Sequence, residues 1–527
     1  MIDVAKSYIN GLLADSTYVN VTPGMDRDQL IEALTARMTP TLAAFIADNF
    51  EVASSINTPE IPLLGSGFDA TVWKGRDGTP YAGQVFVSTR GTEPPWVDIW
   101  GADVDLAINV AARTQIIDMV NWWLRETTPA GIQAQQIKWD PLREKPGTIG
   151  MVEPGVVLAD SVAGTGNLVG VTSVQVNGHS LGGHLASSFA RIFGGDNSAV
   201  GSVRVESIET FNSAGFNGDN AEFFFAQIQG LLGTGLTSFD GVEAKQTNFF
   251  AENGIEVTTN TWWFEQMGER IALSQEQGLG TANHSMYRLT DLLALGAALE
   301  KLDSTLTIDK LNEMVKTGSN DPAGSLEGVL DALRLMLDPN AERLPVSDAG
   351  DSDVARKTYH ETLAAWQQSG LFANLAGHLT LTPTTEIANL QSQSKTDFGA
   401  FLALYTLSPV VISTTDAGAL AALKAIQGDL AVDWQADMNA RLYGDTAYEY
   451  AFSEQWYADR AGMLAVLMVR NENDLEHEVL QGSGTPVTYR DLGSDTQVGV
   501  FLGWGVEILN KQWGEISANA EIYREAA

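Results

Sequence analysis

The sequence predicts an α/β fold, in which helices flank a sheet over roughly residues 1–300, followed by a mostly helical C-terminal region. Over the first 300 residues, short apolar runs with strand character alternate with longer runs of helical periodicity. One strand-like run, 173–177, also leads through two closely spaced glycines directly into a helical run, 181–193. The length of 527 residues exceeds that of one simple core and predicts two or three domains.

The N-terminal elements follow from periodicity and turn residues. Residues 1–60 have a helical pattern, which Pro59 and Pro62 interrupt. Residues 66–91 predict a β-hairpin that turns at Arg76-Asp77-Gly78 and runs into a strand over 84–89. A helix is predicted over 102–125 because its apolar residues recur at helical spacing.

Further strands and helices alternate after residue 173. Two more strands are predicted over 203–211 and 246–251, and an amphipathic helix over 285–300. The predicted domains are 1–304, an α/β sheet with a helical N-terminal extension, and 305–480, a mainly helical region. Residues 481–527 form a third segment with short strand and helix patterns.

The charge and composition exclude several classes of protein. The net charge of −35 repels phosphate backbones, so nucleic-acid binding is not expected. The chain has no cysteine, which excludes disulfides, thiolate catalysis and cysteine-bound zinc. No histidine and carboxylate cluster with metal-ligand spacing stands out, so neither a metal nor another cofactor is expected.

The sequence also carries information about location. The first residues lack a basic segment followed by an apolar core, and no stretch of 18 apolar residues occurs. Together with the missing cysteines and the acidic surface, this pattern suits a protein secreted without a classical signal peptide. An extracellular location is therefore expected, with a cytoplasmic one as the alternative.

The segment Gly178-His179-Ser180-Leu181-Gly182 is the strongest chemical signal. A Gly-x-Ser-x-Gly pattern gains meaning when a strand precedes it and a helix follows, because the serine then lies on a tight turn at the sheet edge. Here both conditions hold. Ser180 is therefore the predicted nucleophile, and the alternative is a strand-to-helix loop with an incidental serine.

A nucleophilic serine needs a base, and the chain has six histidines. A nucleophilic serine on such a strand-to-helix turn is typical of the α/β-hydrolase fold. In that fold the histidine comes last in the chain, in a loop after the final strand, and this order selects His284. His360 and His477 lie in charged helical runs typical of solvated side chains, and His378 flanks an apolar run and could be a core residue. The alternative for His284 is a surface or helix-capping role.

The acid that orients the base should follow the strand over 246–251. That segment contains Glu252, the first candidate, and Glu256, the second. The alternative is an acid from elsewhere, Asp219 or Asp240.

Two N–H groups should stabilise the oxyanion. The amide of Leu181 follows the nucleophile directly and is one donor. The loop after an earlier strand, Arg90-Gly91-Thr92, offers Thr92 as the other. The alternative for this loop is a plain turn that ends a strand.

With these residues in view, the chain resembles the class 3 lipases. Arg90-Gly91-Thr92 followed by Trp100-Gly101-Ala102-Asp103 is similar to a motif of that family, as are Gly178-His179-Ser180-Leu181-Gly182-Gly183 and Glu209-Thr210-Phe211-Asn212. The resemblance implies an oxyanion role for Thr92. The family's usual triad aspartate is not evident here.

A closer likeness is to lipase-like modules of large bacterial exoproteins that carry calcium-binding repeats. It covers about 60–500 and rests on segments such as Gly67-Phe68-Asp69-Ala70-Thr71 and Asn283-His284-Ser285. The repeats themselves are missing, so calcium binding is not implied.

The expected function is hydrolysis of carboxylic esters of lipids through an acyl-enzyme, as a lipase or esterase. The alternatives are a phospholipase A1 with the same triad, or a non-catalytic hydrolase-fold module of a secreted adhesin or toxin. Residues 221–239 could form a mobile apolar flap, and Trp262-Trp263-Phe264 could line an acyl pocket; both could instead be core. Peripheral contact with lipid interfaces is the expected interaction besides the ester substrate.

Overall fold

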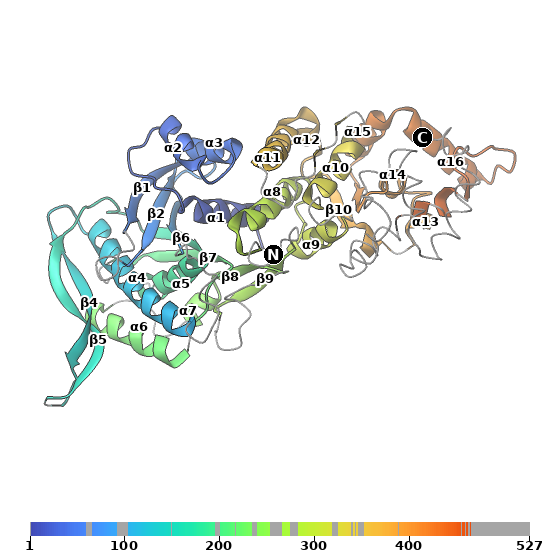
Figure 1. Ribbon diagram of the computed structural model, residues 1–527. Coiled ribbons are helices and arrows are strands. Elements are labelled where there is room, and N and C mark those ends of the chain that lie inside the picture. The colour runs from blue at the N-terminus through green and yellow to red at the C-terminus, as the bar shows by residue number, and fades with distance from the viewer. Residues whose placement is uncertain are drawn as a thin grey trace. The chain divides into compact units, whose positions relative to one another are not determined.

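The computed structural model describes most of residues 2–464 (Figure 1). The segments outside the described part are 1, 59–65, 92–103, 149, 195–200, 217, 234–239, 253–265, 275–282, 319–324, 339–340, 343, 346–352, 388, 455, 459, 462–463 and 465–527. The chain divides into two compact units. One contains Lys6–Leu273 and Leu279–Thr290, and the other contains Met1–Ala5, Ser274–Gly278 and Asp291–Ala527.

A mostly parallel seven-stranded sheet forms the centre of the first unit, with the strand order β1-β2-β3-β6-β7-β8-β9. The first three strands pair antiparallel, and the others pair parallel. Their bounds are β1 Phe50–Asn57, β2 Asp69–Gly75, β3 Val85–Thr89, β6 Ser173–His179, β7 Arg204–Phe211, β8 Gln246–Ala251 and β9 Glu269–Leu273. This arrangement confirms the predicted α/β class.

Helices cover both faces of this sheet. Along β2 and β3, Val72 and Val87 pack in one apolar cluster with α4, α5 and α6, whereas Trp73 and Phe86 pack in another with α1, α2 and α3. Adjacent strand residues point to opposite faces, so the two clusters lie on opposite sides of the sheet. The helices of this part of the chain are α1 Val4–Ser16, α2 Arg27–Leu34, α3 Pro40–Asn49, α4 Val104–Thr127, α5 Leu181–Phe193, α6 Gly218–Leu232 and α7 Asp240–Glu243.

The parallel register brings the carboxyl ends of β3, β6 and β7 together. Thr89 at the end of β3 is opposite Gly178 of β6, and His179 is opposite Phe211 at the end of β7. Ligand sites in open α/β sheets lie outside the carboxyl ends of the strands. The end of β6 is therefore where a site is expected.

The structure corrects the prediction that residues 1–60 are helical throughout. Residues 50–57 form β1, because buried and more exposed side chains alternate along them and the strand pairs antiparallel with β2. A second element was not predicted at all. β4 Gln133–Glu144 and β5 Val152–Ala163 form an antiparallel hairpin separate from the main sheet, anchored where the Asn121 side chain accepts a hydrogen bond from the Ile137 N–H (2.8 Å).

The chain after residue 285 is mainly helical. Its elements are α8 Met286–Leu302, α9 Ile308–Lys316, α10 Ser325–Leu337, α11 Asp353–Gln368, α12 Gly370–Leu375, β10 Thr380–Pro383, η4 Thr384–Glu386, α13 Leu390–Gln393, α14 Phe398–Thr406, β11 Val410–Ser413, α15 Ala417–Gln427 and α16 Asp429–Tyr443. β10 and β11 form a small antiparallel pair. The strand patterns predicted over 480–502 lie outside the described residues.

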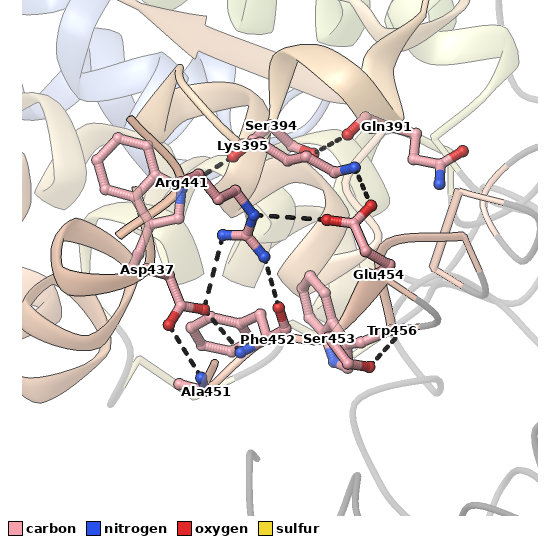
Figure 2. Close-up of polar contacts among 11 residues, drawn as sticks. Gln391, Ser394, Lys395, Asp437, Arg441, Ala451, Phe452, Ser453, Glu454 and Trp456 are labelled. Atoms are coloured by element: carbon pink, nitrogen blue, oxygen red, sulfur yellow. Dashed lines mark hydrogen bonds and ion pairs between the residues drawn. The ribbon is translucent and has the colours of Figure 1, made fainter. Parts of the chain in front are cut away.

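A buried carboxylate secures the segment that follows α16 (Figure 2). Asp437 accepts hydrogen bonds from the N–H groups of Ala451 (2.9 Å) and Phe452 (2.8 Å), and Arg441 donates to the Phe452 carbonyl (2.8 Å). Glu454 pairs with both Arg441 and Lys395. The carboxylates and cations of this cluster pair with one another and with the main chain, so we interpret the cluster as structural.

None of the described helices combines the length and the apolar character that a membrane span requires.

Candidate active site

Ser180 lies between the end of β6 and the start of α5 in a backbone conformation that is rare for residues other than glycine. Its φ is 58° and its ψ is −126°. Such a conformation costs roughly 1–3 kcal/mol and persists only where surrounding contacts enforce it. Here the Ser180 N–H donates to the Phe211 carbonyl (2.9 Å), and the Ser180 carbonyl accepts from Gly183 (3.0 Å) and Ala214 (3.1 Å).

The flanking glycines are required by close backbone approach. A Cβ on Gly178 would lie 2.3 Å from the Gly182 carbonyl oxygen, and one on Gly182 would lie 2.2 Å from the Thr89 carbonyl oxygen. A Cβ on Gly91 would lie 2.8 Å from the His179 carbonyl oxygen. The end of β3 and the residue after Arg90 therefore pack directly against the turn that holds Ser180.

The Ser180 hydroxyl is buried and makes no hydrogen bond to the residues that the structure describes. Leu181 supplies the first amide of α5, which has no acceptor within the helix and lies at its positive end. A Cβ on Gly91 would be 3.1 Å from this nitrogen, so the loop after β3 borders the same position. Thr92, the predicted second donor, lies outside the described residues.

His284 lies in a short turn before α8 and is brought to the same end of the sheet. Its carbonyl accepts hydrogen bonds from His179 Nε2 (2.8 Å) and from Asn212 Nδ2 (3.2 Å). The rings of His284 and His179 are 4.8 Å apart. His284 is therefore adjacent to the residue that precedes Ser180, and the Ser180 hydroxyl and His284 Nδ1 make no hydrogen bond to each other.

Burial determines the charge state of His284. It lowers the pKa of this imidazole to about 4, so the ring is neutral at pH 7. Its Nδ1 atom is buried and hydrogen-bonds to none of the described residues. A neutral imidazole can accept a proton, as a general base must.

The acid is the part of the predicted triad that the described residues leave open. Glu252 directly follows β8 with an exposed side chain, and its N–H donates to the Leu273 carbonyl (2.9 Å). Glu256 lies outside the described residues, as do the side chains of Asp219 and Asp240. The choice among these carboxylates stays a prediction.

Two residues missed by the sequence analysis support the site. Asn212, at φ 43°, donates to the carbonyls of Asn283 (3.3 Å) and His284, and its Oδ1 accepts from the Ala251 N–H (3.0 Å). Tyr18 Oη lies 2.6 Å from His179 Nδ1. Position 18 offered no signal in the sequence, whereas Asn212 directly follows a predicted strand.

Of the other described histidines, His184 and His360 are buried and bonded to neighbouring groups, whereas His378 is exposed. His184 donates from Nδ1 to the Gly215 carbonyl (3.1 Å), and burial lowers its pKa to about 4. His360 is buried and lies 2.8 Å from Asp291, so its interpretation as a solvated residue is wrong. His378 is about half exposed, so the core interpretation is also wrong. His477 lies outside the described residues.

Two partners account for the burial of His360. Asp291 accepts two hydrogen bonds from Arg356 (2.7 and 2.8 Å) as well as one from His360. Burial opposes ionisation of Asp291, but Arg356 and His360 outweigh it and hold the pKa of this carboxyl below its usual range. Asp291, Arg356 and His360 thus form an internal ion-pair cluster rather than a second site.

The predicted apolar flap is largely a packed helix. Residues 218–232 form α6, whose Phe224, Phe225 and Ile228 are buried in the core. Glu222 pairs with the buried Arg191 of α5 through two short contacts (2.6 and 2.8 Å). The core interpretation is therefore correct for Phe224, Phe225 and Ile228, whereas Phe223 is exposed. Residues 234–239 and Trp262-Trp263-Phe264 lie outside the described residues.

Comparison of the chain with protein-family models gives no match, and comparison with curated proteins gives none either.

Proposed function

We propose that the chain is a serine hydrolase of the α/β-hydrolase fold that cleaves carboxylic esters of lipids through an acyl-enzyme. The observation that carries this proposal is the conformation of Ser180, with φ 58° and ψ −126° at a strand-to-helix turn. A strained serine at this place is typical of a nucleophile elbow, which places the hydroxyl at the carboxyl end of the central strand. A serine in an ordinary loop has no reason to adopt it.

The strand order supports the same proposal. The nucleophile follows a central parallel strand, β6, and His284 follows β9 at the end of the sheet. The candidate acids Glu252 and Glu256 follow β8, between the two. This is the chain order of nucleophile, acid and histidine that the α/β-hydrolase fold uses.

In the proposed reaction, Ser180 attacks the ester carbonyl while the neutral His284 takes its proton. The amides of Leu181 and Thr92 stabilise the tetrahedral oxyanion, and Glu252 or Glu256 orients the imidazole. His284 then protonates the leaving alcohol, which leaves an ester between the acyl group and Ser180. A water molecule, deprotonated by His284, hydrolyses this acyl-enzyme and restores the serine.

The lipid character of the ester rests on the resemblance to class 3 lipases at Arg90-Gly91-Thr92 and Gly178-His179-Ser180-Leu181-Gly182-Gly183. Hydrolysis of p-nitrophenyl butyrate and p-nitrophenyl palmitate, with and without calcium, tests both the reaction and the acyl length. We expect wild-type activity on at least one of them. A preference for palmitate supports a lipid ester, and a preference for butyrate supports a small-ester hydrolase.

Two variants isolate the nucleophile. Ser180→Ala should lower kcat by at least about a thousandfold, because the covalent step is lost. Ser188→Ala is the matched control: Ser188 is a buried serine of α5 whose hydroxyl donates to the His184 carbonyl (2.8 Å), and its loss should leave kcat within about twofold. A fluorophosphonate probe should label wild type and Ser188→Ala at Ser180. Equal activity of Ser180→Ala and wild type would refute the proposal.

A further inference from the structure

Tyr18, in the turn after α1, is linked to His284 through one side chain. Its hydroxyl lies 2.6 Å from His179 Nδ1, and His179 Nε2 lies 2.8 Å from the His284 carbonyl oxygen. A carbonyl oxygen can only accept a hydrogen bond, so Nε2 carries the proton of His179. Nδ1 is then the acceptor, and Tyr18 donates to it. The two partners therefore select one tautomer of His179.

His179 is buried and neutral. Burial lowers its pKa well below the usual value, and the nearby His284 lowers it further. Only the neutral ring can accept from Tyr18 at Nδ1 and donate to the His284 carbonyl at Nε2. The directional chain from Tyr18 to His284 thus depends on a ring that stays uncharged at pH 7.

Two guanidinium groups hold the Tyr18 ring. That of Arg37 lies 4.4 Å and that of Arg90 lies 5.3 Å from the ring centroid. Arg37 is paired with Asp15 (2.9 Å) and Arg90 with Asp69 (2.7 Å). These contacts restrict the ring and so fix the direction in which its hydroxyl points.

We propose that Tyr18 is a positioning residue for His284, acting through His179. The inference rests on the proposed function, in which His284 is the general base. The Tyr18 hydroxyl selects the His179 tautomer that donates to the His284 main chain, and this donation holds the His284 main chain against the residue that precedes Ser180. Neither Tyr18 nor His179 touches the reacting atoms. The helical N-terminal extension thereby contributes to catalysis through a single hydroxyl group.

Tyr18→Phe tests this role because it removes the hydroxyl and keeps the ring between the two arginines. We expect kcat on p-nitrophenyl butyrate to fall about tenfold with KM nearly unchanged, because base alignment matters after binding. The unpaired Nδ1 of the buried His179 should also lower the unfolding temperature by a few degrees. Tyr443→Phe is the matched control: Tyr443 is largely exposed at the end of α16, and its variant should keep the wild-type kcat. An unchanged kcat in Tyr18→Phe would overturn the inference.

A second measurement reports on the tautomer itself. With ¹⁵N-labelled histidine, the chain gives signals from six residues. His179 is assigned by its loss in His179→Gln, and in wild type it should show the Nε2–H tautomer. In Tyr18→Phe the Nδ1 signal should move toward that of an unbonded nitrogen. A wild-type His179 in the Nδ1–H form would refute the inference.

The two proposals fail in different ways. If wild type neither hydrolyses esters nor reacts with a fluorophosphonate, the proposed function fails, and with it the role of Tyr18 in catalysis. If wild type is active and Tyr18→Phe equals it in kcat and in the rate of Ser180 labelling, only the inference about Tyr18 fails.

Discussion

The side-chain amide of Asn212 donates a hydrogen bond to the His284 carbonyl over 3.2 Å, across 72 residues of sequence. The same side chain accepts from the Ala251 N–H. Asn212 therefore joins the ends of β7 and β8 to the turn that carries His284. The position of His284 is thus set by the sheet edge rather than by its own turn alone.

Asn212→Asp should disrupt this junction. The variant keeps the shape and tolerates φ 43°, but it places a carboxylate oxygen against two carbonyl oxygens. We expect kcat to fall about thirtyfold, equivalent to roughly 2 kcal/mol. Asn389→Asp, the same change at an exposed asparagine with φ 58°, is the control and should keep full activity. Equal kcat values for the two variants would contradict the prediction.

The strain at Ser180 should be visible in stability. Glycine adopts φ 58° and ψ −126° freely, whereas alanine suffers the same Cβ strain as serine. The free energy of unfolding of Ser180→Gly should therefore exceed that of Ser180→Ala by about 1 kcal/mol. This difference includes the opposing effect of the greater freedom of glycine in the unfolded chain. Urea denaturation measures the difference. A less stable glycine variant would argue against a strained elbow.

Glycine at position 182 should be indispensable for folding of the site. In Gly182→Ala the new Cβ would lie 2.2 Å from the Thr89 carbonyl oxygen. The Cβ position is set by the main chain and the oxygen belongs to it, so no side-chain rotation relieves the clash. We expect a loss of about 3 kcal/mol in the free energy of unfolding and a loss of esterase activity. Gly230→Ala in α6 meets no atom within 4 Å, so it should be neutral or stabilise by up to about 1 kcal/mol. Wild-type stability of Gly182→Ala would contradict this packing.

The pH dependence of hydrolysis should reflect the buried base. Because burial lowers the pKa of His284 to about 4, the imidazole stays deprotonated well below neutral pH. We expect kcat/KM to be constant from pH 8 to about pH 5.5 and to fall with a midpoint near 4, measured on p-nitrophenyl butyrate in a discontinuous assay. A midpoint near 6.5 would indicate a solvated imidazole.

Folding stability should also fall on acidification. The pKa of His184 is about 4 in the folded chain and about 6.5 when unfolded, so the unfolded state binds more protons between these values. This residue contributes stability that is fully present above about pH 6.5 and is reduced by roughly 2 kcal/mol at pH 5. His184→Gln should therefore lose less stability than wild type between pH 7.5 and 5.

The sequence by itself determined the features that depend on neighbouring residues. Gly178, Ser180 and Gly182 lie within five consecutive positions, and their spacing specified the tight turn. The apolar alternation before them specified the strand, and the helical periodicity after them specified α5. Strand and helix periodicity also specified the α/β class and most parallel strands. Residues 50–57 are the exception: the sequence pattern predicted a helix there, and the strand forms through its pairing with β2.

Only the tertiary structure decided which distant residues meet at the site. Tyr18, His179, Asn212 and His284 are separated by up to 266 positions and carry no shared periodicity, so the order of the strands in the sheet brings them together. His360 is a second example. It lies in a charged helical run, which is typical of solvated residues, yet its contact with Asp291, itself paired with Arg356, makes it a buried one. Local patterns encode backbone conformation, whereas hydrogen bonds between distant side chains follow from how the sheet and its helices pack.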